Sequence, residues 1–142
     1  MRILLLITAI LSSSLLFGQS TDSPIGRWVT VDDETGAKKS VVEITATGKT
    51  FTGKIVEILT ENKTAVCPKC SGDQKNAPIL GLTIVSDLVA DDDYWSDGTI
   101  LDPTKGKTYG LSIWYEDDNP NVLFVRGKHW TGLYRTQTWQ RQ

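Results

Sequence analysis

The sequence has few of the residues from which metal and redox sites are usually built. Its 142 residues include two cysteines, Cys67 and Cys70, and one histidine, His129. A structural zinc site commonly uses four cysteine or histidine ligands, so a closed site within one chain would have to recruit carboxylates. We therefore predict no metal and no cofactor.

Positive charge is also scarce. The chain has 15 Lys and Arg residues against 17 Asp and Glu, and its formal net charge is −2. Proteins that bind nucleic acid neutralise phosphates with clustered basic residues. The mild acidic balance therefore argues against nucleic acid as a partner.

A recognisable catalytic arrangement is missing as well. The sequence has no Gly-x-Ser-x-Gly motif, and His129 lies beside Trp130 with no recognisable nucleophile partner. The acidic run at residues 91–93 does not fit a calcium-binding EF-hand loop, because Tyr94 or Trp95 falls where oxygen ligands belong. We read the acidic runs as solvated turns and predict that the protein is not an enzyme.

The first twenty residues have the composition of an export signal. A short basic start, Met1-Arg2, precedes an apolar run from Ile3 to Phe17, and small residues follow at Gly18 and Ser20. The run is shorter than the roughly 20 apolar residues that span a bilayer, although a retained anchor is the alternative. We predict a cleaved signal peptide over residues 1–20 and a single domain over residues 21–142. The mature protein is then periplasmic or secreted and not an integral membrane protein.

The rest of the chain has short runs typical of β-strands, with no convincing helical period. Turn-forming Gly, Asn, Asp and Pro separate these runs. The predicted strands are Gly26 to Val31, Lys39 to Ala46, Thr50 to Leu59, Leu82 to Val89, Tyr94 to Leu101, Lys107 to Glu116, Val122 to Lys128 and Leu133 to Gln140. Because closing such a sheet removes its exposed edges, we predict an all-β fold, an antiparallel up-and-down β-barrel of about eight strands.

Alternation along one strand indicates which side chains face the core. In "KTYGLSIWY", Tyr109, Leu111, Ile113 and Tyr115 share one face, which is the better core candidate, and Trp114 lies on the other. The residues that we predict to bind a ligand are Trp95, Lys107, Tyr109, Tyr115 and Arg126. Lys107, Tyr109 and Arg126 could form a polar end to an apolar cavity and bind an anionic head group. Alternatively, Lys107 caps a turn and Tyr109 fills the core.

Both cysteines lie in "CPKCSGDQKN", within the long irregular link between residues 60 and 78. A redox pair would need a helix start in a βαβ setting, which the neighbouring sequence does not resemble. In an exported protein a disulfide is the default state of such a pair. A four-residue ring should stabilise the fold by only about 2 kcal/mol, so we expect a local staple that shapes a loop over one mouth of the barrel.

The stretch "GRW" at residues 26–28 resembles the Gly-x-Trp that opens the first strand of lipocalins and avidins. The resemblance implies that Trp28 closes one end of the barrel and that an arginine from the last strand lies over it. Arg135 and Arg141 are the two candidates. The stack would be structural and would contribute roughly 0.5–2 kcal/mol.

Several segments in order along the chain resemble the DUF2147 family of exported bacterial proteins. They are "IGRW" at 25–28, "FTGKIVEI" at 51–58, "CPKCSG" and "KNAPILGL" within 67–82, "YWSDGTILDPTKGKTY" at 94–109, "FVRG" at 124–127 and "RTQTWQR" at 135–141. The resemblance implies an exported protein with a lipocalin-like β-barrel. It implies no activity and no catalytic residue.

Two functional hypotheses follow. In the first, the exported barrel is non-enzymatic and binds a small apolar or amphipathic molecule, since barrels of about eight strands either fill their interior or hold one small ligand. In the second, the barrel is solid and acts as a periplasmic protein-interaction module through the cysteine loop and Trp114 or Trp130. The sequence leaves both open.

Overall fold

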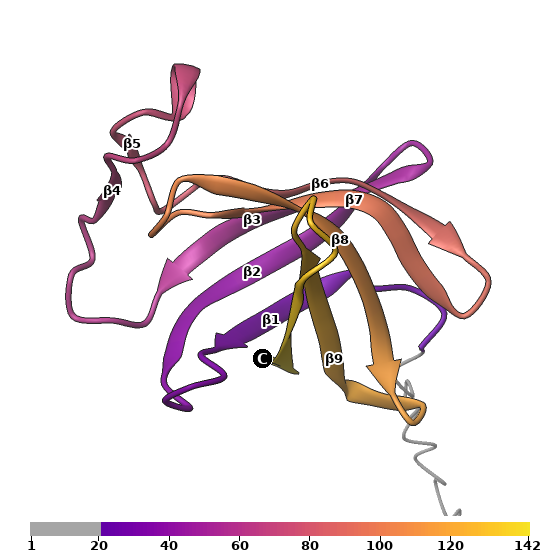
Figure 1. The fold of residues 1–142 in the computed structure, drawn as a ribbon. Helices are drawn as coiled ribbons and strands as arrows, with labels where there is room; N and C mark the ends of the chain where they lie inside the picture. The colour runs from indigo at the N-terminus through magenta and orange to yellow at the C-terminus, as the bar shows by residue number, and fades with distance from the viewer. Residues whose placement is uncertain (1–20) are drawn as a thin grey trace, which may run out of the picture.

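The computed structural model describes residues 21–142, and the predicted signal peptide lies outside this range. Eight antiparallel strands form a closed barrel (Figure 1). They are β1 (Gly26–Val31), β2 (Lys38–Thr47), β3 (Thr50–Ile58), β6 (Thr83–Asp91), β7 (Tyr94–Asp102), β8 (Lys107–Glu116), β9 (Asn119–Lys128) and β10 (Tyr134–Arg141). The predicted all-β up-and-down barrel is confirmed.

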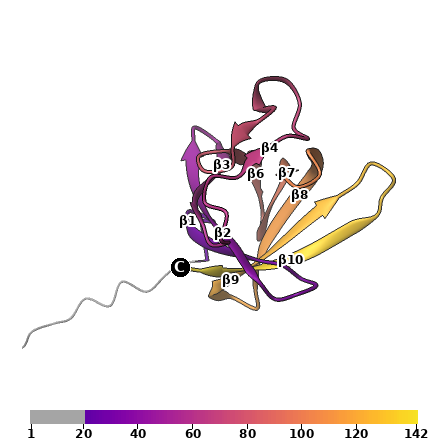
Figure 2. The same ribbon diagram turned by 90° about the vertical axis from the view of Figure 1, so that its left-hand side faces the viewer.

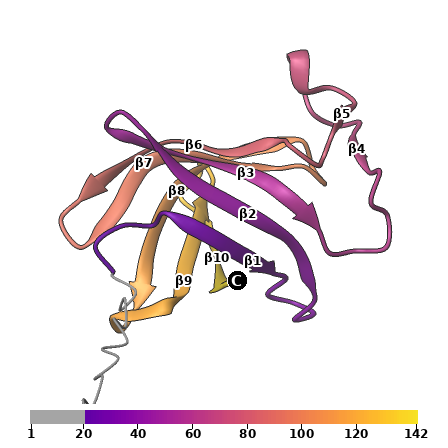
Figure 3. The same cartoon turned by 180° about the vertical axis from the view of Figure 1, so that it is seen from behind.

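Each barrel strand pairs with its neighbour in the sequence, and β1 pairs with β10 to close the sheet. The closing pairs place Trp28 opposite Arg141 and Thr30 opposite Trp139. Seen from behind, β1 lies between β2 and the C-terminal strand (Figure 3). The closure removes the exposed edges that an open sheet of this size would present.

The link between β3 and β6 forms a small separate unit. It contains β4 (Val66–Cys67), the 3₁₀ turn η1 (Gly72–Gln74) and β5 (Ala77–Pro78). Cys67 and Cys70 form a disulfide with a Cα–Cα distance of 5.4 Å, as predicted. The two-residue strands were not predicted, because a strand of that length shows no alternation.

This unit packs on the outer face of the barrel wall. Val85 points into the barrel. A Cβ added to Gly53 would lie about 3 Å from both Val85 and the core residue Val42, so these side chains share the inner face. Ile84 therefore points outward, yet it is buried in the same cluster as Cys67 and Cys70. The Cys67 Sγ atom lies 3.2 Å from the carbonyl oxygen of Pro103, in the β7–β8 turn. The cysteine unit therefore covers the outer side of β6 and β7.

Two aspartates introduce bulges into β6 and β7. Asp87 and Asp97 have φ values of 55° and 57°, in the left-handed region that Asp tolerates better than most residues. The two strands come so close there that a Cβ on Gly98 would lie 2.8 Å from the carbonyl oxygen of Ser86. Such bulges bend a strand, which helps a sheet to close.

The core fills the interior of the barrel with large side chains. Leu111, Ile113 and Tyr115 are buried as predicted, and Trp114 lies on the outer face. The largest fully buried side chains include Trp28, Trp139, Ile44, Leu88 and Leu123. Three of the buried rings, Trp28, Trp95 and Tyr115, contact one another at the end of the barrel that holds the start of β1.

Candidate functional site

The barrel end at the start of β1 is sealed. Trp28 is fully buried, and its Nε1 donates a hydrogen bond to the carbonyl oxygen of Pro24 at 2.9 Å. The Arg141 guanidinium lies 4.3 Å from the centre of the Trp28 ring. Gly26 has a φ of 144°, and a Cβ there would lie 2.6 Å from Arg141 Nη1. The glycine before the tryptophan therefore leaves the space that the arginine occupies.

Arg141, not Arg135, is the arginine over Trp28. Arg141 Nε donates to the carbonyl oxygen of Pro120 at 2.7 Å, and Nη2 donates to the Tyr115 hydroxyl at 3.1 Å. Arg135 lies at the start of β10, at the opposite end of the barrel. The two arginines in "RTQTWQR" thus have separate structural roles.

Two of the predicted ligand-binding residues belong to the sealed end. Trp95 and Tyr115 are buried, and their rings meet edge to face with centres 5.9 Å apart. The Tyr115 hydroxyl donates to the carbonyl oxygen of Ser23 at 2.5 Å. Burial raises the pKa of Tyr115, and the Arg141 guanidinium partly opposes this rise. These two side chains pack the barrel end, and together with Arg126 they also border a hollow on its outer side.

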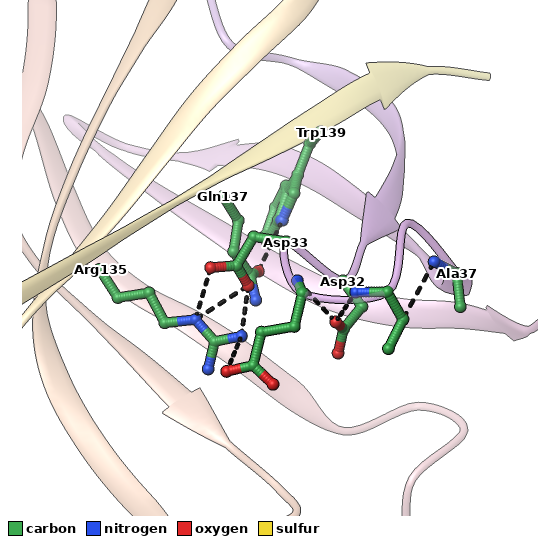
Figure 4. Close-up of polar contacts among 8 residues, drawn as sticks. Asp32, Asp33, Ala37, Arg135, Gln137 and Trp139 are labelled. Atoms are coloured by element: carbon green, nitrogen blue, oxygen red, sulfur yellow. Dashed lines mark hydrogen bonds and ion pairs between the residues drawn. The ribbon is translucent and has the colours of Figure 1, made fainter.

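At the other end, which we call the open end, Arg135 bridges β10 and the β1–β2 turn. Its guanidinium makes a bidentate ion pair with the Asp33 carboxylate (Figure 4). These hydrogen bonds are the main reason that the pKa of Asp33 is lowered. The pKa of Asp32 is also lowered, chiefly because the backbone amides of Thr35 and Glu34 donate to its carboxylate.

Polar side chains continue below this bridge into the barrel. Gln137 Oε1 accepts a hydrogen bond from Trp139 Nε1 at 3.4 Å (Figure 4). Thr30 and Ser40, both buried, join their hydroxyl groups at 2.9 Å. The open half of the interior is therefore more polar than the sealed half.

A hollow of about 690 Å³ lies at the rim of the open end, between the start of β8 and the β9–β10 hairpin. Two predicted residues, Lys107 and Tyr109, line it. The other lining residues are Thr108, Gly110, Lys128, His129 and Trp130. Among residues 21–142, the residues that line this hollow include no Asp or Glu.

Aromatic rings border the rim hollow beside the two lysines. The ring centres of Tyr109 and His129 lie 6.2 Å apart, and those of His129 and Trp130 lie 5.4 Å apart. His129 Nδ1 is 2.8 Å from the Thr131 hydroxyl. The site thus combines two ammonium groups with three neighbouring rings.

Arg126 does not join Lys107 and Tyr109. It lies opposite Ser112 on β8, and both point to the outer face, whereas Tyr109 shares the inner face with Leu111. Its guanidinium lies 4.9 Å from the centre of the Trp114 ring and 4.2 Å from that of Tyr134. Its Nε donates to the Thr136 hydroxyl at 2.9 Å.

The stacked Arg126 lies in a second, larger hollow on the outer wall, with a volume of about 1,220 Å³. Trp114 and Tyr134 line one part of it, and the acidic turns after β6 and β8 line another. Trp95 and Tyr115 also line this outer hollow, so it reaches the sealed end, whereas the rim hollow does not.

Sequence reasoning missed Lys128 and His129 as site residues, and it named Trp130 only as a possible contact with a protein partner. These three residues lie at or beside the link between the predicted strands Val122 to Lys128 and Leu133 to Gln140, and this is where the β9–β10 hairpin reverses. Its position beside Lys107 depends on the register that pairs Gly110 with Lys128. That register is a long-range property, which alternation along one strand does not reveal.

Among residues 21–142, no group of three or more His, Cys, Asp and Glu side chains is arranged to hold a metal ion. In the same part of the chain, no helix has the length and apolar character needed to cross a membrane.

The family model described as an uncharacterized protein conserved in bacteria (DUF2147) matches residues 26–141. The chain belongs to the DUF2147 family. The match begins at the glycine and ends at the arginine that meet at the sealed end, so in this member the family region coincides with the closed barrel.

A solved structure from Helicobacter pylori is similar to this DUF2147 chain. Its title reads "Protein HP1028 from the human pathogen Helicobacter pylori belongs to the lipocalin family". The TM-score is 0.72 at 19% sequence identity, over 84% of this chain and 83% of that one. The likeness shows a lipocalin-like fold. No curated protein sequence matches the chain.

Proposed function

We propose that this protein is an exported, non-enzymatic barrel that binds a small amphipathic molecule with an anionic group at its open end. The observation that carries the proposal is the rim hollow. Lys107 and Lys128 line it together with the rings of Tyr109 and Trp130.

The chemistry of the rim hollow fits such a ligand. Ammonium groups form charge-assisted hydrogen bonds with phosphate or carboxylate oxygens. The aromatic rings offer apolar surface to a hydrocarbon or ring portion. Its volume of about 690 Å³ lies in the range of roughly 300–1,000 Å³ that is usual for small-molecule pockets.

The packing of the sealed half places the ligand at the rim rather than deep in the barrel. Trp28, Trp95 and Tyr115 are buried there and fill the interior. A ligand that entered deeply would have to displace these side chains. We therefore propose that the apolar portion rests against Tyr109 and Trp130.

Export is supported by the disulfide. Cys67 and Cys70 are bonded to each other, and such bonds persist in the periplasm and outside the cell. An N-terminal signal over residues 1–20 agrees with this location.

Calorimetric titration with dodecyl phosphate, below the concentration at which it forms micelles, tests the proposal. Dodecyl maltoside serves as an uncharged probe with the same alkyl chain. We expect dodecyl phosphate to bind, and Lys107→Ala and Lys128→Ala each to weaken binding about tenfold, since each removes one hydrogen bond between charged groups.

Lys49→Ala is the matched control, because Lys49 lies in the β2–β3 turn at the sealed end. It should bind dodecyl phosphate like the unaltered protein. Equal affinity for the two detergents, or equal loss from all three lysine variants, would refute a rim site for an anionic group.

A second candidate function is protein interaction through the outer hollow. The observation in its favour is the stack of Trp114, Arg126 and Tyr134, because Trp, Tyr and Arg dominate interaction hot spots. Crosslinking in cells should then capture one dominant partner that Trp114→Ala loses while dodecyl phosphate binding persists. Capture that does not change in Trp114→Ala would argue against this candidate.

A further inference from the structure

The tip of the β9–β10 hairpin exposes large apolar side chains. Trp130 is 90% exposed, Leu133 is 76% exposed and the adjacent Tyr134 is 62% exposed. Isolated apolar residues are normal on a surface, but a cluster of this kind marks an interaction site. The tip, defined here as residues 130–133, therefore needs an explanation beyond folding.

The hairpin turn holds these side chains in place. The backbone amide of His129 donates to the carbonyl oxygen of Leu133 at 2.8 Å, and that of Gly132 donates to the carbonyl oxygen of His129 at 2.9 Å. Gly132 adopts a φ of 94°, which suits glycine. Trp130 and Leu133 are thus presented by a closed, hydrogen-bonded turn.

The hairpin extends beyond its neighbours for a topological reason. Among residues 21–142, the strand pairing between β1 and β10 begins at Trp28, opposite Arg141, and ends at Thr30, opposite Trp139. The part of β10 before Trp139 therefore extends past β1. Figure 2 shows the hairpin projecting from the side of the barrel.

The hairpin itself carries charge of one sign, although Asp33 and Glu34 of the β1–β2 turn pair with Arg135 at its base. From Asn119 to Gln142 the sequence contains no Asp or Glu, and it contains Arg126, Lys128, Arg135 and Arg141. Asp117 and Asp118 precede β9, at the other end of a ten-residue strand that spans roughly 30 Å. Counted from the tip, Lys128 and then Arg135 are the first basic residues of the hairpin, and Arg126 comes next. Arg135 is neutralised by its ion pair with Asp33, so Lys128 and Arg126 are the cations available near the tip.

The size of the tip favours a lipid surface over a folded partner. A stable protein interface buries about 800 Å² on each partner, more than two side chains on a narrow turn provide. Tryptophan and tyrosine favour the boundary between lipid headgroups and acyl chains. Basic residues near that boundary are attracted to anionic headgroups.

We infer that the tip of the β9–β10 hairpin inserts into the headgroup region of an anionic lipid membrane and holds the barrel at its surface. Trp130 and Leu133 supply the apolar contact, and Lys128 and Arg126 supply the attraction. This inference goes beyond the proposed ligand binding and does not depend on it.

Co-sedimentation with vesicles tests the inference. The protein from Thr21 onward, which carries all eight barrel strands and their core, avoids a contribution from the apolar N-terminal segment. We expect it to sediment with vesicles of phosphatidylglycerol and phosphatidylcholine in equal parts, and less with phosphatidylcholine alone. High salt should weaken the binding, because it screens surface charge.

Leu133→Asp is the decisive variant, because Leu133 is exposed and does not line the rim hollow. We expect the vesicle partition coefficient to fall at least tenfold, since burying one leucine side chain in an apolar environment raises a partition coefficient by about tenfold or more. Leu80→Ala is the matched control, since it removes an exposed leucine from the cysteine unit, and it should bind like the unaltered protein.

No binding to the mixed vesicles, or binding that Leu133→Asp leaves unchanged, would overturn the inference. A dimer in solution that Leu133→Asp dissociates would also overturn it, because the tip would then contact a second copy. Dodecyl phosphate titration of Leu133→Asp separates this inference from the proposed function, since that variant should keep its affinity for the detergent.

Discussion

Arg141 joins three parts of the sealed end. It stacks on Trp28, donates to the carbonyl oxygen of Pro120 and donates to the hydroxyl of Tyr115. We expect Arg141→Ala to lower the free energy of unfolding by about 2–3 kcal/mol, because it removes a partly buried cation–π contact and hydrogen bonds from a charged donor. Urea unfolding followed by tryptophan fluorescence measures this change.

Arg27→Ala is the control for that experiment. Arg27 makes an exposed ion pair with Glu43 on the outer face, and such pairs contribute about 0–1 kcal/mol. A loss from Arg27→Ala as large as that from Arg141→Ala would contradict the structural role of Arg141.

The Arg135 and Asp33 pair should make stability depend on pH in acid. The pKa of Asp33 is lowered from 3.8 by the guanidinium, so the pair stabilises the fold above 3.8 and this contribution disappears as the pH falls through the folded-state pKa. We expect Asp33→Asn to cost about 0.2–1 kcal/mol at neutral pH, because the pair is largely exposed, and less at pH values below 3.8.

Unfolding in urea at neutral pH and in acid measures this difference. The exposed Glu61→Gln is the control for the loss of one carboxylate. A gap between Asp33→Asn and the unaltered protein that stayed the same at both pH values would show that the ion pair does not cause it.

At the scale of elements, the cysteine unit docks on the β7–β8 turn through Gly106. A Cβ at Gly106 would lie 1.9 Å from the carbonyl oxygen of Lys69, inside the disulfide ring. We expect Gly106→Ala to destabilise the protein by about 1–3 kcal/mol more than a glycine substitution that meets open space, because backbone must move.

Gly48→Ala is the matched variant. Gly48 has a φ of 62° against 64° for Gly106, and a Cβ there would meet nothing within 4 Å. Both substitutions carry the same backbone penalty, so the difference between their unfolding free energies reports the docking contact. Equal losses would mean that the unit does not dock on the turn.

The eight barrel strands were predictable because each is a β-prone run that ends at turn-forming residues, and strands such as β8 also alternate between two faces. Tyr109, Leu111, Ile113 and Tyr115 were assigned to one face, and the structure places them on the inner face. The bulges at Asp87 and Asp97 were not predicted. They arise where two strands approach closely, which is a tertiary effect that overrides the period of two.

The candidate site was predictable only in part. Lys107 and Tyr109 lie at the rim hollow, whereas Arg126 lies on the outer face. The choice between Arg135 and Arg141 over Trp28 also needed the structure, since it depends on how β10 pairs with β1. Alternation gave the face of each residue in its own strand, and the register between strands decided which residues meet.

At the scale of the whole molecule, the two ends of the barrel are unequal. One end is closed by Trp28, Tyr115 and Arg141. The other has an ion pair between Asp33 and Arg135, and a hollow with two lysines at its rim. This inequality is the physical basis for placing a ligand at the open end.

The most direct test of that placement is a map of backbone amide chemical shifts by NMR during titration with dodecyl phosphate. The account predicts changes confined to Lys107–Gly110 and Lys128–Trp130, with Trp28 and Arg141 unchanged. Changes centred on the sealed end or on Trp114, or no changes at all, would contradict it.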